Sequence, residues 1–156
     1  MTEDRLEIRP VAQRDLDDLI ALYTDDILGR TRESAGPEDR EAYLKAFERV
    51  AADASTCVYV ALADRALGGT FQLTITPGIS RRGVIRATIE SVRTRTDLRG
   101  QGIGARMMTY AVEEARRRGA DIVQLTSDLA REDAHRFYER LGFERTHAGY
   151  KLLLRR

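Results

Sequence analysis

The sequence predicts an α/β fold in which residues 1–156 form a single domain around a mixed, mostly antiparallel sheet. Short alternating apolar runs and longer runs with apolar residues every three or four positions follow in the order β-α-α-β-β-β-α-β-α-β-β. A chain of 156 residues can bury a substantial core. No repeat, low-complexity segment or linker divides it. We therefore expect about seven strands flanked by four helices.

The composition excludes several classes of function. A net charge of +1 argues against a strongly basic nucleic-acid surface. The acidic N-terminus does not resemble a signal peptide, and no apolar run approaches the ~18 residues of a membrane span. The single cysteine, Cys57, excludes an internal disulfide and fits a reducing, cytoplasmic compartment. One cysteine and two histidines, far apart, predict no metal site.

The first half of the chain predicts two helices between strands. Residues 6–10 alternate and end at a proline, as a short strand does, and an amphipathic helix follows from residue 15. A polar loop leads to Pro37, where two acids suit the first turn of a helix reaching residue 51. The apolar stripes of these helices are Leu16, Leu19, Ile20, Tyr23 and Ile27 in the first, and Tyr43, Phe47, Val50 and Ala51 in the second.

The second half predicts a meander followed by alternating helices and strands. Strands are expected at 56–63, 66–77 and 84–96, and a helix from Gly102 to a closing Gly119. A strand at 121–127 and a helix closed by Gly142 come next, and segments 143–146 and 149–154 are expected to pair as a final hairpin. The apolar helix positions are Ile103, Met107, Met108, Ala111, Val112 and Ala115, then Ala134, Phe137, Tyr138 and Leu141.

The stretch RGQGIG, residues 99–104, has the parts of an anion cradle. Glycines at a helix start leave backbone N–H groups and the positive end of the helix dipole accessible to a phosphate. The alternative is a strand-to-helix turn that simply needs small residues. Gly100, Gly102 and Ala105 also satisfy the dinucleotide pattern G-x-G-x-x-A, but the preceding strand is polar. A Walker lysine is absent.

The pattern R-x-x-G-x-G, formed by Arg99, Gly102 and Gly104, resembles the GNAT superfamily of acetyl-CoA-dependent N-acetyltransferases. Residues 89–108 are similar to the core motif of that family, and EDAHRFYERLGF at 132–143 is similar to its C-terminal motif. The resemblance covers the element order of the whole chain. It implies acetyl-CoA as cosubstrate, and a sheet bulged in the strand before the glycine loop and splayed between its fourth and fifth strands.

The resemblance also implies which residues contact the cofactor. The backbone of Val92, Arg93 and Thr94 would pair with the pantetheine arm. Many members carry an asparagine seven residues before the motif tyrosine, whereas this chain has Arg131, which either reaches a phosphate or lies on the surface. The amides that would hold the pyrophosphate belong to Arg99, Gly100, Gln101, Gly102, Ile103, Gly104 and Ala105.

Two residues are the catalytic candidates. Glu90 occupies a position where similar enzymes often carry a base that deprotonates the amine through a water; its alternative is a solvated strand residue pairing with Arg86 or Arg93. Tyr138 fills the motif tyrosine, whose hydroxyl would protonate the leaving thiolate; its alternative is a core aromatic. His147 is a weaker candidate for a second base or a substrate contact.

The resulting hypothesis is direct transfer of an acetyl group to a small primary amine. The acceptor pocket is expected from the first two helices, loop 29–39 and the final hairpin. Asp25, Asp26 and Glu33 would attract a cationic amine, whereas Arg30 and Arg32 would accept a phosphate or carboxylate on the acceptor. The alternatives are a peptide or protein amine as acceptor, and a non-catalytic acyl-CoA-binding or sensor module. A homodimer is left open.

Overall fold

The computed structural model describes residues 5–25 and 36–155. The chain divides into two compact units, Met1–Gln124 and Leu125–Arg156. The first unit contains most of the sheet and the glycine loop; the second contains the tyrosine motif. In the part of the chain that the structure describes, no helix has the length and apolar content needed to cross a membrane.

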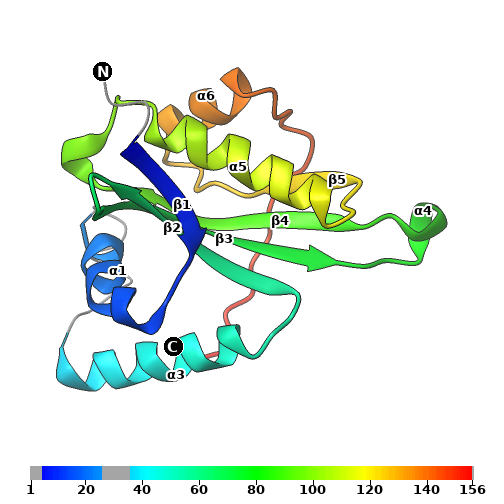
Figure 1. The fold of residues 1–156 in the computed structure, drawn as a ribbon. Coiled ribbons are helices and arrows are strands. Elements are labelled where there is room, and N and C mark those ends of the chain that lie inside the picture. The colour runs from blue at the N-terminus through cyan, green and yellow to red at the C-terminus, as the bar shows by residue number, and fades with distance from the viewer. Residues whose placement is uncertain (1–4, 26–35, 156) are drawn as a thin grey trace. The chain divides into compact units, whose positions relative to one another are not determined.

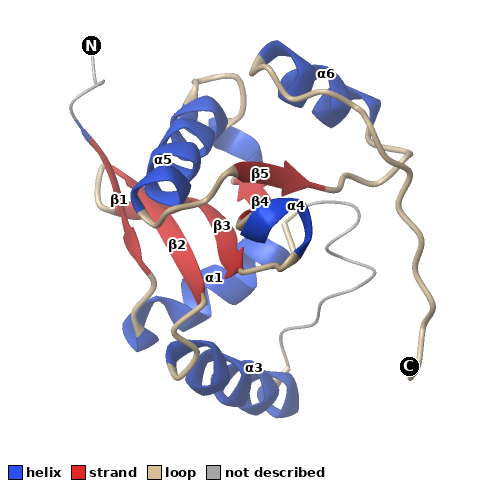
Figure 2. Ribbon diagram, turned by 90° about the vertical axis from the view of Figure 1, so that its right-hand side faces the viewer, coloured by secondary structure: helices blue, strands red, loops and turns tan. Residues whose placement is uncertain are grey.

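The sheet has five strands in the order in which they occur along the chain (Figures 1 and 2). They are β1 (Leu6–Pro10), β2 (Thr56–Ala63), β3 (Ala66–Thr76), β4 (Arg86–Thr94) and β5 (Ile122–Leu125). The first four pair antiparallel. Ile85 accepts amide hydrogen bonds from Asp121 and Ile122, and Thr88 contacts Gln124. The residue numbers rise together along the two strands, from Ile85 with Asp121 to Thr88 with Gln124. Therefore β5 is parallel to β4, and the sheet is mixed.

Helices cover both faces of this sheet in the first unit (Figure 1). The helices α1 (Leu16–Tyr23) and α3 (Pro37–Ala51) lie on one face, and α5 (Ile103–Arg117) lies on the other. The 3₁₀ turns η2 (Gln13–Asp15) and η3 (Thr96–Leu98) precede α1 and α5. A further one-turn helix, α4 (Ser80–Gly83), was not expected; two of its arginines have left-handed φ angles of 53° and 64°, so it is close to the turn predicted there.

The two faces of β2 supply two halves of the core. Val58 and Val60 belong to a buried cluster with Leu19, Leu22 and Leu67 on the α1 side. On the α5 side, Tyr59 stacks on Phe71 at 5.0 Å between ring centroids and meets Tyr110 edge-on at 5.4 Å. The buried residues that α5 contributes are Ile103, Met107, Met108, Ala111 and Ala115. Because successive side chains of a strand point to opposite faces, β2 contributes to both layers of the core.

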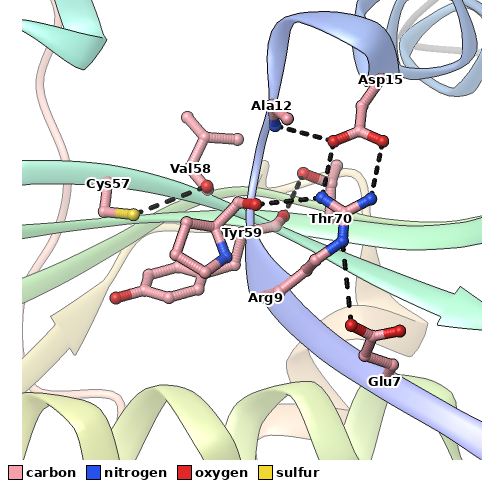
Figure 3. A network of polar contacts seen from close by, with 9 residues as sticks. Glu7, Arg9, Ala12, Asp15, Cys57, Val58, Tyr59 and Thr70 are labelled. Atoms are coloured by element: carbon pink, nitrogen blue, oxygen red, sulfur yellow. Dashed lines mark hydrogen bonds and ion pairs between the residues drawn. The ribbon is translucent and has the colours of Figure 1, made fainter.

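An ion pair fixes the entry into α1 (Figure 3). The guanidinium of Arg9 on β1 donates to both carboxylate oxygens of Asp15 at 2.7 and 2.9 Å, and the Ala12 amide donates to the same carboxylate at 2.7 Å. The Asp15 side chain is 9% exposed and that of Arg9 is 20% exposed. The hydrogen bonds from Arg9 lower the pKa of Asp15 below its usual value.

The second unit contains α6 (Glu132–Arg140), which is closed by Gly142 at φ 96°. The predicted final hairpin is wrong, because residues 143–155 contain no strand. The apolar side chains that suggested it are largely exposed: Tyr150 is 93%, Leu152 86% and Leu154 89% exposed. Apolar spacing expresses a preference for extended backbone, but a strand also needs a partner for its hydrogen bonds, and a lone hairpin is marginal in water. Within residues 5–25 and 36–155 the structure has five strands and five α-helices, instead of the seven and four expected.

Candidate active site

The strand before the glycine loop carries a bulge directly after Glu90. Thr70 on β3 faces Arg93 and Gln72 faces Glu90, so the single residue Phe71 lies opposite two residues of β4. One of these two, Ser91, has a left-handed φ of 53°. An extra residue in one strand of an antiparallel pair is a β-bulge, which re-aims the backbone and bends the strand. The bulge expected in this strand is therefore present.

Beyond the bulge, β4 extends past the end of its parallel neighbour β5. Its contacts toward β5 lie at Ile85 and Thr88, and β5 ends at Leu125. By this parallel register, residues 92–94 lie beyond the end of β5, while Arg93 and Thr94 still pair with β3. This half-buried segment is the one predicted to contact a pantetheine arm. Divergence of the two strands stays a prediction.

The turn between β4 and α5 is packed closely against β3. The Arg95 amide donates to the Gly68 carbonyl at 2.8 Å, and its guanidinium donates to the Leu67 carbonyl. A Cβ added at Gly68 would lie 2.8 Å from Leu98 Cδ1, and one added at Gly69 would lie 2.7 Å from Met107 Sδ. Two adjacent glycines therefore permit the turn and α5 to approach the sheet. The glycine pair inside a strand pattern was the available signal for this approach.

The N-terminus of α5 has the features of an anion-binding site. Gly100 and Gly102 have φ angles of 77° and 82°, and an added Cβ at either would meet no atom within 4 Å. Gly102 is the N-cap, and no described side chain caps the helix. Whereas α1, α3 and α6 each begin with two acids, the first turn of α5 has none. Its unpaired amides and positive dipole end therefore face open space, with Arg99 exposed beside them.

The candidate base lies on the same unit. Glu90 is exposed, and its Oε2 accepts a weak hydrogen bond from the Gln72 amide on β3 at 3.4 Å. The sequence did not indicate this neutral partner, Gln72. Arg86 or Arg93 was the partner expected for Glu90. Glu90 immediately precedes the bulge. Only Ser91 separates it along β4 from residues 92–94, the segment predicted to contact the cofactor.

The second unit carries the remaining candidates. The Tyr138 ring meets Phe137 and Phe143 edge-on at centroid distances of 5.1 and 6.0 Å, and the residue is half-buried. Arg131 is the N-cap residue of α6, and its amide donates to a carbonyl of the preceding turn. His147 is exposed, with Nδ1 2.6 Å from the hydroxyl of its neighbour Thr146. Both roles considered for Tyr138 remain compatible with this packing.

Of the residues expected to attract the acceptor, the structure describes only Asp25. Asp26, Arg30, Arg32 and Glu33 lie outside the described residues. Asp25 is described, and its Oδ2 accepts hydrogen bonds from both the amide and the hydroxyl of Thr96, at 2.7 and 2.6 Å. This oxygen is therefore engaged with the turn before the glycine loop, which no sequence pattern indicated.

No cluster of metal ligands marks the site in the described residues. Within residues 5–25 and 36–155, no three His, Cys, Asp or Glu side chains gather as metal ligands would. A polar cavity of about 540 Å³ lies at the β2–β3 turn, lined by Arg5, Leu6, Glu7, Leu62, Asp64 and Arg65. None of these residues belongs to the candidate site, so the cavity does not define it.

Comparison with known proteins identifies the class. The model of the Acetyltransferase (GNAT) family matches residues 17–143, which include Glu90, the glycine loop and Tyr138. The chain belongs to the GNAT acetyltransferase family. The crystal structure of a transcriptional regulator from Bacillus halodurans C-125 has a TM-score of 0.92 and 40% identity, covering 96% of this chain and 99% of that one.

Curated relatives are also similar. An aminoalkylphosphonate N-acetyltransferase of Salmonella typhimurium is 46% identical over 50 residues, which is 32% of each protein. An uncharacterized N-acetyltransferase of Bacillus subtilis, YhdJ, is 34% identical over 109 residues, which is 67% of this chain and 73% of YhdJ. The match thus spans about a third of the Salmonella relative and most of YhdJ.

Proposed function

We propose that this protein, working as one domain, transfers the acetyl group of acetyl-CoA to the primary amine of a small molecule. The observation that carries the proposal is the uncapped, acid-free N-terminus of α5, which follows a bulged strand and faces open space at two glycines. That combination suits a diphosphate, because backbone N–H groups and the helix dipole both favour negative charge there.

The cofactor contacts follow from this arrangement. The amides of residues 99–105 would hold the diphosphate, with the exposed Arg99 adding positive charge. The edge of residues 92–94 would pair with the pantetheine arm as an added strand does. Arg131 on the second unit is a further candidate for a phosphate. The thioester supplies the activated acetyl group, and we propose that no metal takes part.

The proposed reaction is a direct transfer within a ternary complex. Glu90 removes a proton from the ammonium group through a water, which its exposed position permits. The free amine nitrogen forms a bond to the acetyl carbon while the carbon–sulfur bond breaks. The electron pair of that bond leaves on sulfur, and Tyr138 donates its hydroxyl proton to the thiolate. The acylated nitrogen then loses its remaining extra proton, which passes through solvent to the Tyr138 phenolate. An N–H of residues 92–94 would stabilise charge on the carbonyl oxygen.

The acceptor that we favour is a small amine carrying an anionic group. Support comes from the similarity to an enzyme whose name specifies aminoalkylphosphonates. Amino sugars, polyamines and peptide amines are the competing acceptors. A non-catalytic acyl-CoA sensor is the rival from another class, since a structure 40% identical to this chain is described as a transcriptional regulator. The lone cysteine supports a cytoplasmic location; sedimentation would distinguish a monomer from a homodimer.

The first experiment measures cofactor binding. Acetyl-CoA at about 100 times its Kd should stabilise the native state by ~2.7 kcal/mol and raise Tm by several degrees. Gly102→Glu should abolish this shift, because it adds bulk and negative charge at the N-terminus of α5. Gly119→Glu is the matched control: it has a similar φ of 85° and open surroundings, but lies at the other end of the helix. It should retain the shift.

A second experiment, on the same wild-type protein, distinguishes an enzyme from a sensor. Free-thiol release is followed with acetyl-CoA and a panel of aminophosphonates, amino sugars, polyamines and peptides. Turnover with a small anionic amine supports the proposal. Stabilisation by NADH instead of acetyl-CoA would refute the cofactor assignment, and CoA binding without turnover on any amine would favour the sensor.

A further inference from the structure

The contact between Asp25 and Thr96 joins two segments that are 71 residues apart in the sequence. Asp25 follows the last residues of α1, and its amide donates to the Leu22 carbonyl. Thr96 begins η3, which leads directly into Arg99 and the glycine loop. One oxygen, Oδ2, accepts both Thr96 hydrogen bonds at 2.7 and 2.6 Å. Charge-assisted bonds of this length are the stronger kind.

The position of Asp25 is unfavourable for α1 itself. The C-terminal end of a helix carries partial negative charge, so an acid there is repelled and a base is favoured. The last turn of α1 contains no basic residue that would offset this effect. A residue that breaks a local preference usually has a role elsewhere in the structure. Thr96 offsets part of this cost through its two hydrogen bonds, and the nearby positive charge of Arg95 adds to it.

The opposite side of the same turn is held by the sheet. The backbone and side chain of Arg95 donate to the carbonyls of Gly68 and Leu67, and its guanidinium also pairs with Asp97 at 2.6 Å. Leu98 packs over Gly68, where a Cβ would not fit. The sheet fixes one side of the turn, and Asp25 holds the other. Between Thr96 and the N-cap Gly102 there are only a few residues to absorb any movement.

We infer that Asp25 is a positioning residue that, through Thr96, holds the loop of residues 99–105 in the conformation that binds the diphosphate of CoA. This inference rests on the function proposed above. It assigns Asp25 to the cofactor side of the site instead of to a cationic acceptor. Pre-organisation of a loop lowers the ordering cost of binding, so its loss should appear in the affinity for CoA.

The variants separate the hydrogen bonds from the charge. Asp25→Ala removes the acceptor, whereas Asp25→Asn retains an oxygen that can accept both Thr96 bonds. Thr96→Val removes the hydroxyl donor and keeps the amide. Asp18→Ala is the matched control, because Asp18 is an exposed acid on the same helix. Calorimetry with CoA should show binding weakened roughly tenfold in Asp25→Ala, as expected for lost charge-assisted bonds. Thr96→Val keeps one of the two bonds, and Asp25→Asn keeps both without the charge, so both should be intermediate. Asp18→Ala should stay within about twofold of wild type.

A second donor distinguishes positioning from general damage. S-acetyl-pantetheine lacks the diphosphate, so its kcat/KM should be the same in wild type and Asp25→Ala. Hydrogen exchange of the amides of residues 95–103 should be faster in Asp25→Ala. If that variant does not fold, Thr96→Val and Asp25→Asn carry the test by the same measurements.

Each outcome has one meaning. Wild-type CoA affinity in Asp25→Ala, in a protein whose wild type binds CoA, overturns the inference alone. A parallel loss with S-acetyl-pantetheine shows general structural damage and also overturns it. A rise only in the KM for the amine returns Asp25 to the acceptor side. Failure of the wild type to bind CoA overturns the proposed function and, with it, this inference.

Discussion

Replacement of Gly69 by alanine tests the close approach of α5 to the sheet. The new Cβ would lie 2.7 Å from Sδ and 2.9 Å from Cε of Met107, and 3.2 Å from the Arg93 carbonyl oxygen. Nonbonded carbon contacts are normally ~3.5–4.0 Å, so the methionine must move by about 1 Å. Met107 is fully buried near the start of α5, and its displacement disturbs the first turns of that helix.

The magnitude follows from two opposing effects. Overfilling a packed core typically costs ~1–3 kcal/mol, although a flexible methionine reduces the strain. Alanine is preferred over glycine within a strand by ~0.5–1 kcal/mol, because the unfolded chain loses less entropy. The net expectation is a loss of roughly 0.5–2 kcal/mol in the free energy of unfolding. In a protein of this size, this loss corresponds to a Tm lower by about 1–8 °C.

Urea unfolding followed by circular dichroism measures this loss. Gly149→Ala is the matched control, because its Cβ would lie 3.9 Å from Thr126 Cγ2, an ordinary contact. Its free energy of unfolding should change by less than about 0.5 kcal/mol. Met107→Val shortens the clashing side chain, so the double variant should lose less than the sum of the two single losses. If Gly69→Ala proved as stable as wild type, close approach would not explain this glycine.

Three further predictions concern charge and chemistry. Because Arg9 lowers the pKa of Asp15, the ionised carboxylate stabilises the fold above the ordinary aspartate pKa of ~3.9, and this stabilisation disappears as pH falls through the lowered value. Asp15→Asn should therefore cost about 2–3 kcal/mol at pH 7, and its urea curves should converge with those of wild type in acid; a constant difference at all pH values would contradict the ion-pair explanation. Glu90→Gln should lower turnover by roughly 10²–10⁴-fold with near-normal CoA affinity, and a normal rate would remove Glu90 from the mechanism. Tyr138→Phe should lower turnover, with partial rescue by a thioester of lower thiol pKa; unchanged turnover where chemistry limits the rate would make Tyr138 a packing residue only.

Features governed by neighbouring residues were predictable from the sequence. The second helix starts at Pro37 as expected, because a proline and acids mark a helix start locally. Gly119 and Gly142 end their helices in the left-handed conformation, as C-terminal glycines do. The start of α5 at Gly102 follows the same logic, since the glycine loop meets an apolar stripe there.

Features that depend on distant partners were not predictable. The close contact that a side chain at Gly69 would make involves Met107, which is on another element. The hydrogen bonds from Thr96 to Asp25 were not foreseen, because no sequence pattern links two residues 71 positions apart. The prediction of a final hairpin was wrong for the same reason. The apolar spacing around Tyr150 suggests extended backbone, but it does not identify a strand that would pair with it. The bulge at Ser91 could be expected only from the resemblance to the GNAT family, because no local pattern in the sequence indicates it.

The bulge in β4 also bears on how this protein could change by mutation. Removal of the Ser91 codon would leave Val92 opposite Phe71, while Glu90 and Arg93 keep their present partners on β3. Such a deletion would relieve a left-handed non-glycine residue, a conformation that costs ~1–2 kcal/mol, and complete the ladder. It would also straighten the backbone that the bulge re-aims. If the bulge shapes the cofactor edge as proposed, selection for stability and selection for acetyl transfer oppose each other at this one codon.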